Sequence, residues 1–125
     1  MTSIQPQKKF PLLKEYQQVF DITPYTIFAY NDIIYTDYEL TGDLLIHEQV
    51  HLKRQKKLGL DKWVKRYLKD KQFRLAEEVI AYTAQLESIK DRELRNRVRL
   101  DSAKTLSSSL YGELVTFEEA LKLLK

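Results

Sequence analysis

The sequence contains no cysteine. This absence excludes disulfide bonds, thiolate zinc sites, iron–sulfur clusters and cysteine nucleophiles. Histidine is nearly absent too, since His47 and His51 are the only two and lie four positions apart. No apolar run approaches the roughly 20 residues that a membrane span needs. The first ten residues form no hydrophobic signal core, so we expect a cytoplasmic protein with no membrane contact.

The charged residues are unevenly distributed along the chain. Residues 1–50 carry three basic and seven acidic side chains, whereas residues 51–74 carry ten basic and only two acidic ones. We call the lysines and arginines of residues 53–74 the basic block. This block has two interpretations that the sequence leaves open. It could face nucleic acid or an acidic protein, or it could be the solvated side of amphipathic helices.

The length of 125 residues and the 43% hydrophobic content are typical of one globular domain spanning residues 1–125. Hydrophobic spacing predicts an α+β fold that is mostly helical, with a small N-terminal β-hairpin packed on a helix. The expected strands are Tyr25–Tyr30 and 33–36, joined by an Asn31-Asp32 turn. The expected helices are 11–20, 42–58, one capped by Asp61, 73–89, part of 90–105, and a last one through Leu124. Thr41 or Asp43 would cap the second, and Thr116 with Glu119 forms a capping box for the last.

The chemistry of the chain is concentrated in His47-Glu48-Gln49-Val50-His51, which lies inside a predicted helix with apolar flanks. Positions i and i+4 share one helix face, so both imidazoles can bind one metal ion. Glu48 would lie beside the ion, where it can hold a metal-bound water and take its proton. The sulfur-free donor set favours Zn²⁺, which lowers the pKa of bound water to about 7.

A catalytic zinc site needs a third protein ligand and one open position. Because the chain has no third histidine, this ligand must be a carboxylate, and the predicted helix 73–89 offers Glu77 and Glu78. Adjacent helix residues point about 100° apart, so only one of them can face the histidines. Glu78 is the preferred ligand because apolar residues follow it and Ala81, three positions on, would let the helices approach. Glu77 is the reserve.

With these residues in place, the sequence resembles the zincin metallopeptidases, and within them the gluzincins, which pair HExxH with a downstream glutamate on a second helix. The segment Glu78-Val-Ile-Ala81-Tyr82 is similar to the E-x-x-A-D or E-x-x-A-Y pattern of several such families. The small size resembles the minigluzincins. Short phage-encoded metallopeptidases likewise end in a Tyr-Gly stretch and an E-E-A-L-like helix, as Tyr111-Gly112 and residues 118–121 do here.

The resemblance implies a zinc-dependent peptidase acting on a peptide or protein substrate. His47 and His51 would be metal ligands and Glu48 the general base, and the strand Tyr25–Tyr30 would take up the peptide by strand addition. Tyr82 and Tyr67 are candidates for the donor that stabilises the oxyanion. Segment 106–125 either covers the cleft and keeps the enzyme latent or simply packs as a last helix.

Two other functions are compatible with the same residues. A zinc-stabilised binding module could dock on DNA or an acidic protein through the basic block, with little or no peptidase activity. SprT-like proteases combine zinc with DNA, but they usually use a third histidine. A metal-free structural protein, in which His47 and His51 only pack, is the third possibility.

Overall fold

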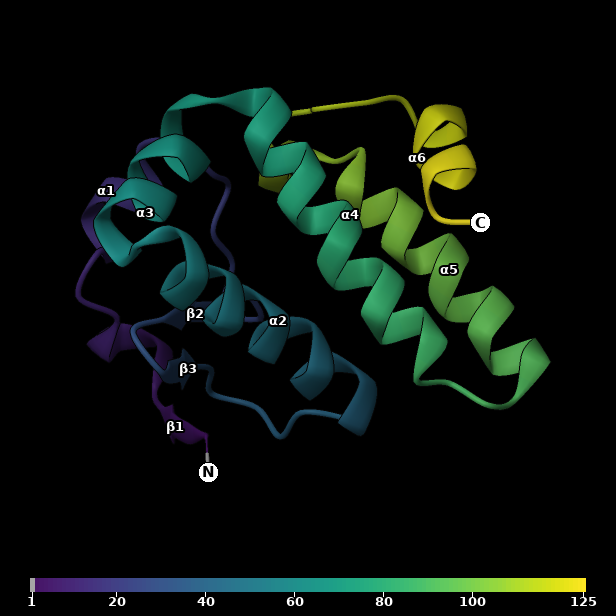
Figure 1. The fold of residues 1–125 in the computed structure, drawn as a ribbon, viewed down its shortest axis with the longest axis horizontal. Helices are drawn as coiled ribbons and strands as arrows, with labels where there is room; N and C mark the ends of the chain where they lie inside the picture. The colour runs from purple at the N-terminus through teal and green to yellow at the C-terminus, as the bar shows by residue number, and fades with distance from the viewer. Residues whose placement is uncertain (1) are drawn as a thin grey trace.

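The structure, a computed structural model, describes residues 2–125 and is mostly helical with one small sheet (Figure 1). The elements in chain order are β1 (Ser3–Gln5), η1 (Gln7–Lys9), α1 (Leu13–Gln17), β2 (Phe28–Tyr30), β3 (Ile33–Tyr35), α2 (Gly42–Leu58), α3 (Leu60–Lys69), α4 (Lys71–Glu87), α5 (Arg92–Leu106), η2 (Ser109–Tyr111) and α6 (Phe117–Leu123). This confirms the predicted α+β class with predominant helix. Among the described residues, no helix has the length and apolar character needed to cross a membrane.

The sheet has three strands in the order β1-β3-β2. The predicted hairpin is confirmed, since β2 pairs antiparallel with β3. Asn31 and Asp32 both have positive φ, 50° and 69°, as the two-residue turns that match strand twist require. β1 was not predicted: it is exposed and pairs in parallel with β3, far along the chain.

The first strand of the hairpin is shorter than the predicted Tyr25–Tyr30. Residues 23–26 form a turn instead, in which the Thr26 amide donates to the Thr23 carbonyl oxygen at 3.1 Å. The side chain of Gln7 donates to the carbonyl oxygens of both residues at 2.8 Å, so these groups are unavailable for strand pairing. The strand therefore begins only at Phe28.

Helix boundaries differ from the predictions where a cap was overlooked. α4 begins at Lys71, not 73, because the Asp70 side chain accepts from the Phe73 amide. Gly59, with φ 94°, ends α2 and also occupies the N-cap position of α3, so Asp61 lies within the first turn of α3 and does not cap it. The region 90–105, predicted helical in part, is helical from Arg92 to Leu106. The capping box of Thr116 and Glu119 is confirmed.

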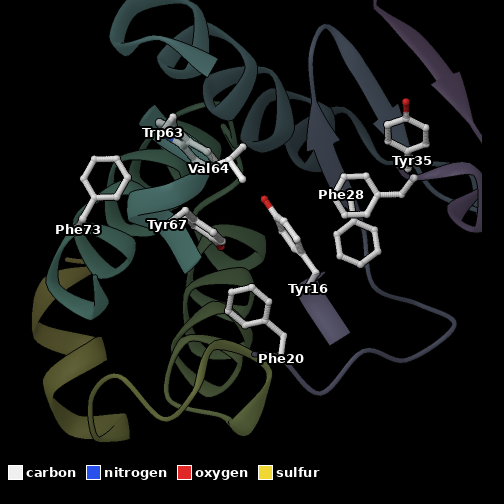
Figure 2. Packing of buried hydrophobic residues seen from close by; sticks show 9 residues of the cluster. Tyr16, Phe20, Phe28, Tyr35, Trp63, Val64, Tyr67 and Phe73 are labelled. Carbon is white, nitrogen blue, oxygen red and sulfur yellow. The ribbon is translucent and has the colours of Figure 1, made fainter. Parts of the chain in front are cut away.

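Two hydrophobic clusters hold the elements together. The first joins the sheet and α1 to α3 and is largely aromatic; Figure 2 shows Tyr16 and Phe20 facing Tyr67, with ring centroids 6.3 and 5.7 Å from it. The second lies among α4, α5 and α6, where Leu106 and Ala120 are fully buried. α2 packs on the sheet through β2 and on α4, so it lies between the two clusters.

Candidate metal centre

The packing of α2 against α4 brings three sequence-predicted side chains together. His47 and His51 lie one helical turn apart on α2, and their Nε2 atoms are 3.2 Å apart. Glu78 of α4 faces both, with Oε1 3.1 Å from His47 Nε2 and Oε2 3.0 Å from His51 Nε2. All three residues are buried, and their possible ligand atoms lie within 4.8 Å of one another. This group could hold a metal ion.

The spacing of these atoms fits a shared ion. Zinc–nitrogen and zinc–oxygen bonds of about 2.0–2.1 Å in a tetrahedral site place neighbouring donor atoms about 3.3 Å apart. The two Nε2 atoms are 3.2 Å apart, and each lies 3.0–3.1 Å from one Glu78 oxygen, Oε1 for His47 and Oε2 for His51. Burial alone would raise the pKa of Glu78, but His51 and His47 outweigh it and hold the pKa well below the usual value. Glu78 is therefore a carboxylate, the form that ligates metals.

The hydrogen bonds that Gln85 makes show which ring nitrogen of His47 carries a hydrogen. The Nε2 amide of Gln85 donates to Asp43 Oδ2 at 2.7 Å, so the amide oxygen of Gln85 must face His47 Nδ1 at 3.0 Å. An amide oxygen can only accept, so Nδ1 carries a hydrogen, and Nε2 is the nitrogen that would bind a metal ion. Burial raises the pKa of Asp43, but the Gln85 and Thr41 hydrogen bonds outweigh it and the net pKa is lowered. Gln85 was not predicted from the sequence, and Asp43 was predicted only as a helix cap.

Glu77 is directed away from the histidines. Arg54 donates to its two carboxylate oxygens at 3.1 and 2.8 Å, and the indole Nε1 of Trp63 donates at 2.8 Å. Glu77 is thus a buried carboxylate that joins α4 to α2 and α3. Of the two glutamates proposed from sequence, the structure brings only Glu78 to His47 and His51.

The two tyrosines suggested as oxyanion donors have different surroundings. Tyr67 donates its hydroxyl to Glu78 Oε2 at 2.5 Å, so it orients that carboxylate. Burial and the charge of Glu78 together raise the pKa of Tyr67 well above its usual value, which keeps the hydroxyl protonated. Tyr82 packs edge-on against the His47 ring, and its hydroxyl lies 3.4 Å from that of Tyr111.

Glu48 lies beside the three candidate ligands. It is 7% exposed, and its Oε2 is 4.0 Å from His47 Nε2. Among residues 2–125 its carboxylate has no hydrogen-bond donor within reach. Burial is the main cause that raises the pKa of Glu48 to about 7; His47 lowers it and Glu78 raises it further. Glu48 can therefore accept or release a proton near neutral pH.

An open cleft of about 500 Å³ leads to this group. Its floor includes His47, Glu48 and Glu78, and its walls come from residues 25–29, from α2 and from one side of α5. Most of its lining is apolar and aromatic. Such a cavity with a few convergent polar groups is the usual form of a ligand or substrate site.

The C-terminal segment contributes to the same cleft. Leu110 and Tyr111 line it, and the Tyr111 carbonyl oxygen accepts from Arg74 Nη1 at 2.9 Å. α6 beyond them packs into the core through Ala120 and Leu124. The segment thus packs as a last helix, while its first part forms a wall of the cleft.

Comparisons with protein-family models, curated proteins and solved structures found no match to this chain. The interpretation of the site therefore depends on its geometry and chemistry.

Replacing Gln85 with leucine should weaken metal binding. Leucine is similar in size but cannot hold the Nδ1 hydrogen of His47, and loss of such a partner typically costs 10–100-fold in metal affinity. We expect a roughly tenfold or larger loss in a zinc competition titration. Gln72→Leu, at an exposed position on the same helix, is the matched control. Equal zinc affinity in all three proteins would contradict this role of Gln85.

In the metal-free protein, Glu48 should make stability fall as pH rises. The pKa of Glu48 is about 7 in the fold against 4.5 ordinarily. Between these values the unfolded chain releases a proton that the folded chain keeps, so the free energy of unfolding decreases with pH. Glu48→Gln removes this pH-dependent contribution to the free energy of unfolding. The stability of the variant relative to the parent should therefore grow by about 3 kcal/mol between the two pKa values. Urea unfolding with a chelator from pH 4.5 to 8 measures it, with the exposed Glu87→Gln as control. A difference that does not change with pH would refute it.

Proposed function

We propose that the protein is a zinc-dependent peptidase of the gluzincin kind with a zincin-like arrangement of helices. The observation that carries this proposal is the Glu48 carboxylate, which faces an open cleft beside the group formed by His47, His51 and Glu78. A carboxylate with a raised pKa that lies in a cleft beside possible metal ligands is typical of a general base.

The three candidate ligands are two imidazole nitrogens and one carboxylate, a sulfur-free set that suits zinc and leaves one position open. When bound there, zinc would polarise the carbonyl of the scissile peptide bond and lower the pKa of a water molecule. Glu48 takes the proton of the attacking water on its carboxylate and then gives it to the leaving amine nitrogen. In the metal-free fold, burial raises the pKa of Glu48 to about 7, toward the range that suits both steps.

The remaining residues orient the reacting groups. Tyr67 and Gln85 hold Glu78 and His47 in place, and Tyr82 is the proposed donor to the oxyanion because its hydroxyl is not used by the ligand group. The substrate peptide would extend along the edge of β2 and the residues before it. Ala29 is not available for pairing through its carbonyl oxygen, which accepts from Gln55 Nε2 at 2.7 Å.

Zinc content and peptide hydrolysis test this function together. We expect one zinc ion per chain in the parent and in Glu48→Gln, and loss of zinc in His51→Ala, measured by atomic emission on the purified proteins. A digest of a peptide library by mass spectrometry should detect cleavage by the zinc-loaded parent. Glu48→Gln should cleave at least 100-fold more slowly, since it keeps the ion but lacks the base.

Three results would count against the proposal. They are a parent that binds no zinc, a zinc-loaded parent that cleaves no peptide, and a Glu48→Gln variant that cleaves as fast as the parent. Glu87→Gln, at an exposed position on α4, is the control for loss of a carboxylate elsewhere.

A second candidate, a module that binds nucleic acid, is favoured by the basic block. Two of its ten members are structural: Arg54 binds Glu77, and Arg74 is 2% exposed. Six lysines are exposed and have no ion-pair partner among residues 2–125, namely Lys53, Lys57, Lys62, Lys65, Lys69 and Lys71. Their charge could attract phosphate groups.

This candidate predicts DNA binding that falls steeply with salt. Fluorescence anisotropy with a labelled duplex should detect binding at 50 mM salt that weakens at least tenfold by 200 mM. Replacing Lys62, Lys65 and Lys69 together with glutamate should abolish it, whereas Glu48→Gln should not change it. Absence of binding at 50 mM salt would exclude this function.

A further inference from the structure

The cleft differs in charge from the rest of the molecule. The chain holds 21 lysines and arginines, yet none of them lines the cleft among residues 2–125. Four carboxylates line it, those of Asp43, Glu48, Glu78 and Asp101. In a chain of net charge +3, a large cleft lined by four carboxylates and by no lysine or arginine favours occupants that carry positive charge.

Three of these carboxylates already have a use within the molecule. Glu78 binds both histidines, Asp43 accepts from Gln85, and Glu48 lies beside the candidate ligands. Asp101 differs from them: its carboxylate is exposed at the side of the cleft and has no ion pair or side-chain hydrogen bond among residues 2–125. It is thus free to bind a cation from outside.

α5 presents one face to the cleft, because its lining residues recur at helical spacing. They are Leu94, Val98, Asp101, Ser102 and Thr105. The face is apolar at its first two positions and polar at the next three. It therefore offers an apolar surface that ends in a carboxylate and hydroxyl groups.

Ser102 offers a second polar group next to Asp101. It is only 5% exposed and lines the cleft, yet its hydroxyl has no hydrogen-bond partner among the described residues. Most serines on helices can bond back to a carbonyl one turn earlier, as Thr105 does to the Asp101 carbonyl oxygen at 3.0 Å. Since the hydroxyl of Ser102 is not sealed from the cleft, it is available to bond to a group that binds there.

From this face we infer that the cleft binds a lysine or arginine side chain of the substrate peptide, with its stem on Leu94 and Val98 and its charged head at Asp101 and Ser102. Only basic side chains combine a long apolar stem with a cationic head that donates several hydrogen bonds. This inference rests on the proposed function for its setting, but it concerns binding and is tested without hydrolysis.

The test measures peptide binding to zinc-loaded Glu48→Gln, which should not cleave the probes. The probes are fluorescein-labelled heptapeptides of alanine and glycine in which each position in turn is lysine, norleucine or glutamate. Norleucine has the stem of lysine without the charge. At one position lysine should bind about fivefold more tightly than norleucine, with glutamate weaker than both. The preference should shrink at 0.5 M salt.

Adding Asp101→Asn to this protein should remove the difference between lysine and norleucine at that position. Glu93→Gln, an exposed residue on the same helix that does not line the cleft, should leave the difference intact. The inference is overturned if lysine and norleucine bind equally at every position, if the preference survives Asp101→Asn, or if none of the peptides binds. A lysine preference in a protein whose parent cleaves nothing would uphold this inference while the peptidase proposal fails.

Discussion

The carboxylate of Glu78 between two imidazoles is the interaction on which the arrangement of the helices depends. A carboxylate that is 1% exposed is strongly destabilising unless positive charge and hydrogen bonds surround it. His47 and His51 of α2 face this carboxylate with their Nε2 atoms, and Tyr67 of α3 donates a hydrogen bond to it. The two carboxylate oxygens of Glu78 therefore fix the positions of α2, α3 and α4 relative to one another. A cation bound at this carboxylate would supply the positive charge that its burial requires.

Arg74 extends this constraint to the C-terminal part of the chain. Its buried guanidinium donates to the carbonyl oxygens of Tyr67, Leu68 and Tyr111 at 2.7, 2.9 and 2.9 Å. Tyr67 is thus held at its backbone by Arg74 and at its hydroxyl by Glu78. Because Arg74 and Glu78 lie one turn apart on α4, a single helix positions both the candidate metal ligand and the wall of the cleft that Tyr111 forms.

The parts of this site that could be predicted from sequence are those whose signals are local. The histidine motif, its helix and the capping box all depend on spacings of three or four residues. Glu78 and Glu77 are adjacent, and the choice between them depends on Arg54 and Trp63, which bind Glu77 from other elements. β1 and the role of Gln85 were missed for the same reason, since each depends on partners about 30 to 40 positions away.

The fold separates the charged residues into two surfaces that the sequence alone does not reveal. Along the chain, the basic block separates the two segments that hold the candidate ligands. In the structure, α3, the second half of α2 and the start of α4 carry its free lysines on the outside. The cleft between residues 25–29 and α5, in contrast, has carboxylates and no lysine or arginine among its described lining. Coulomb attraction would draw polyanions to the first surface and cations to the second. A peptide that enters the cleft with a basic side chain is attracted by the cleft and repelled by the lysine surface, so the same charges that favour its binding also restrict where it binds.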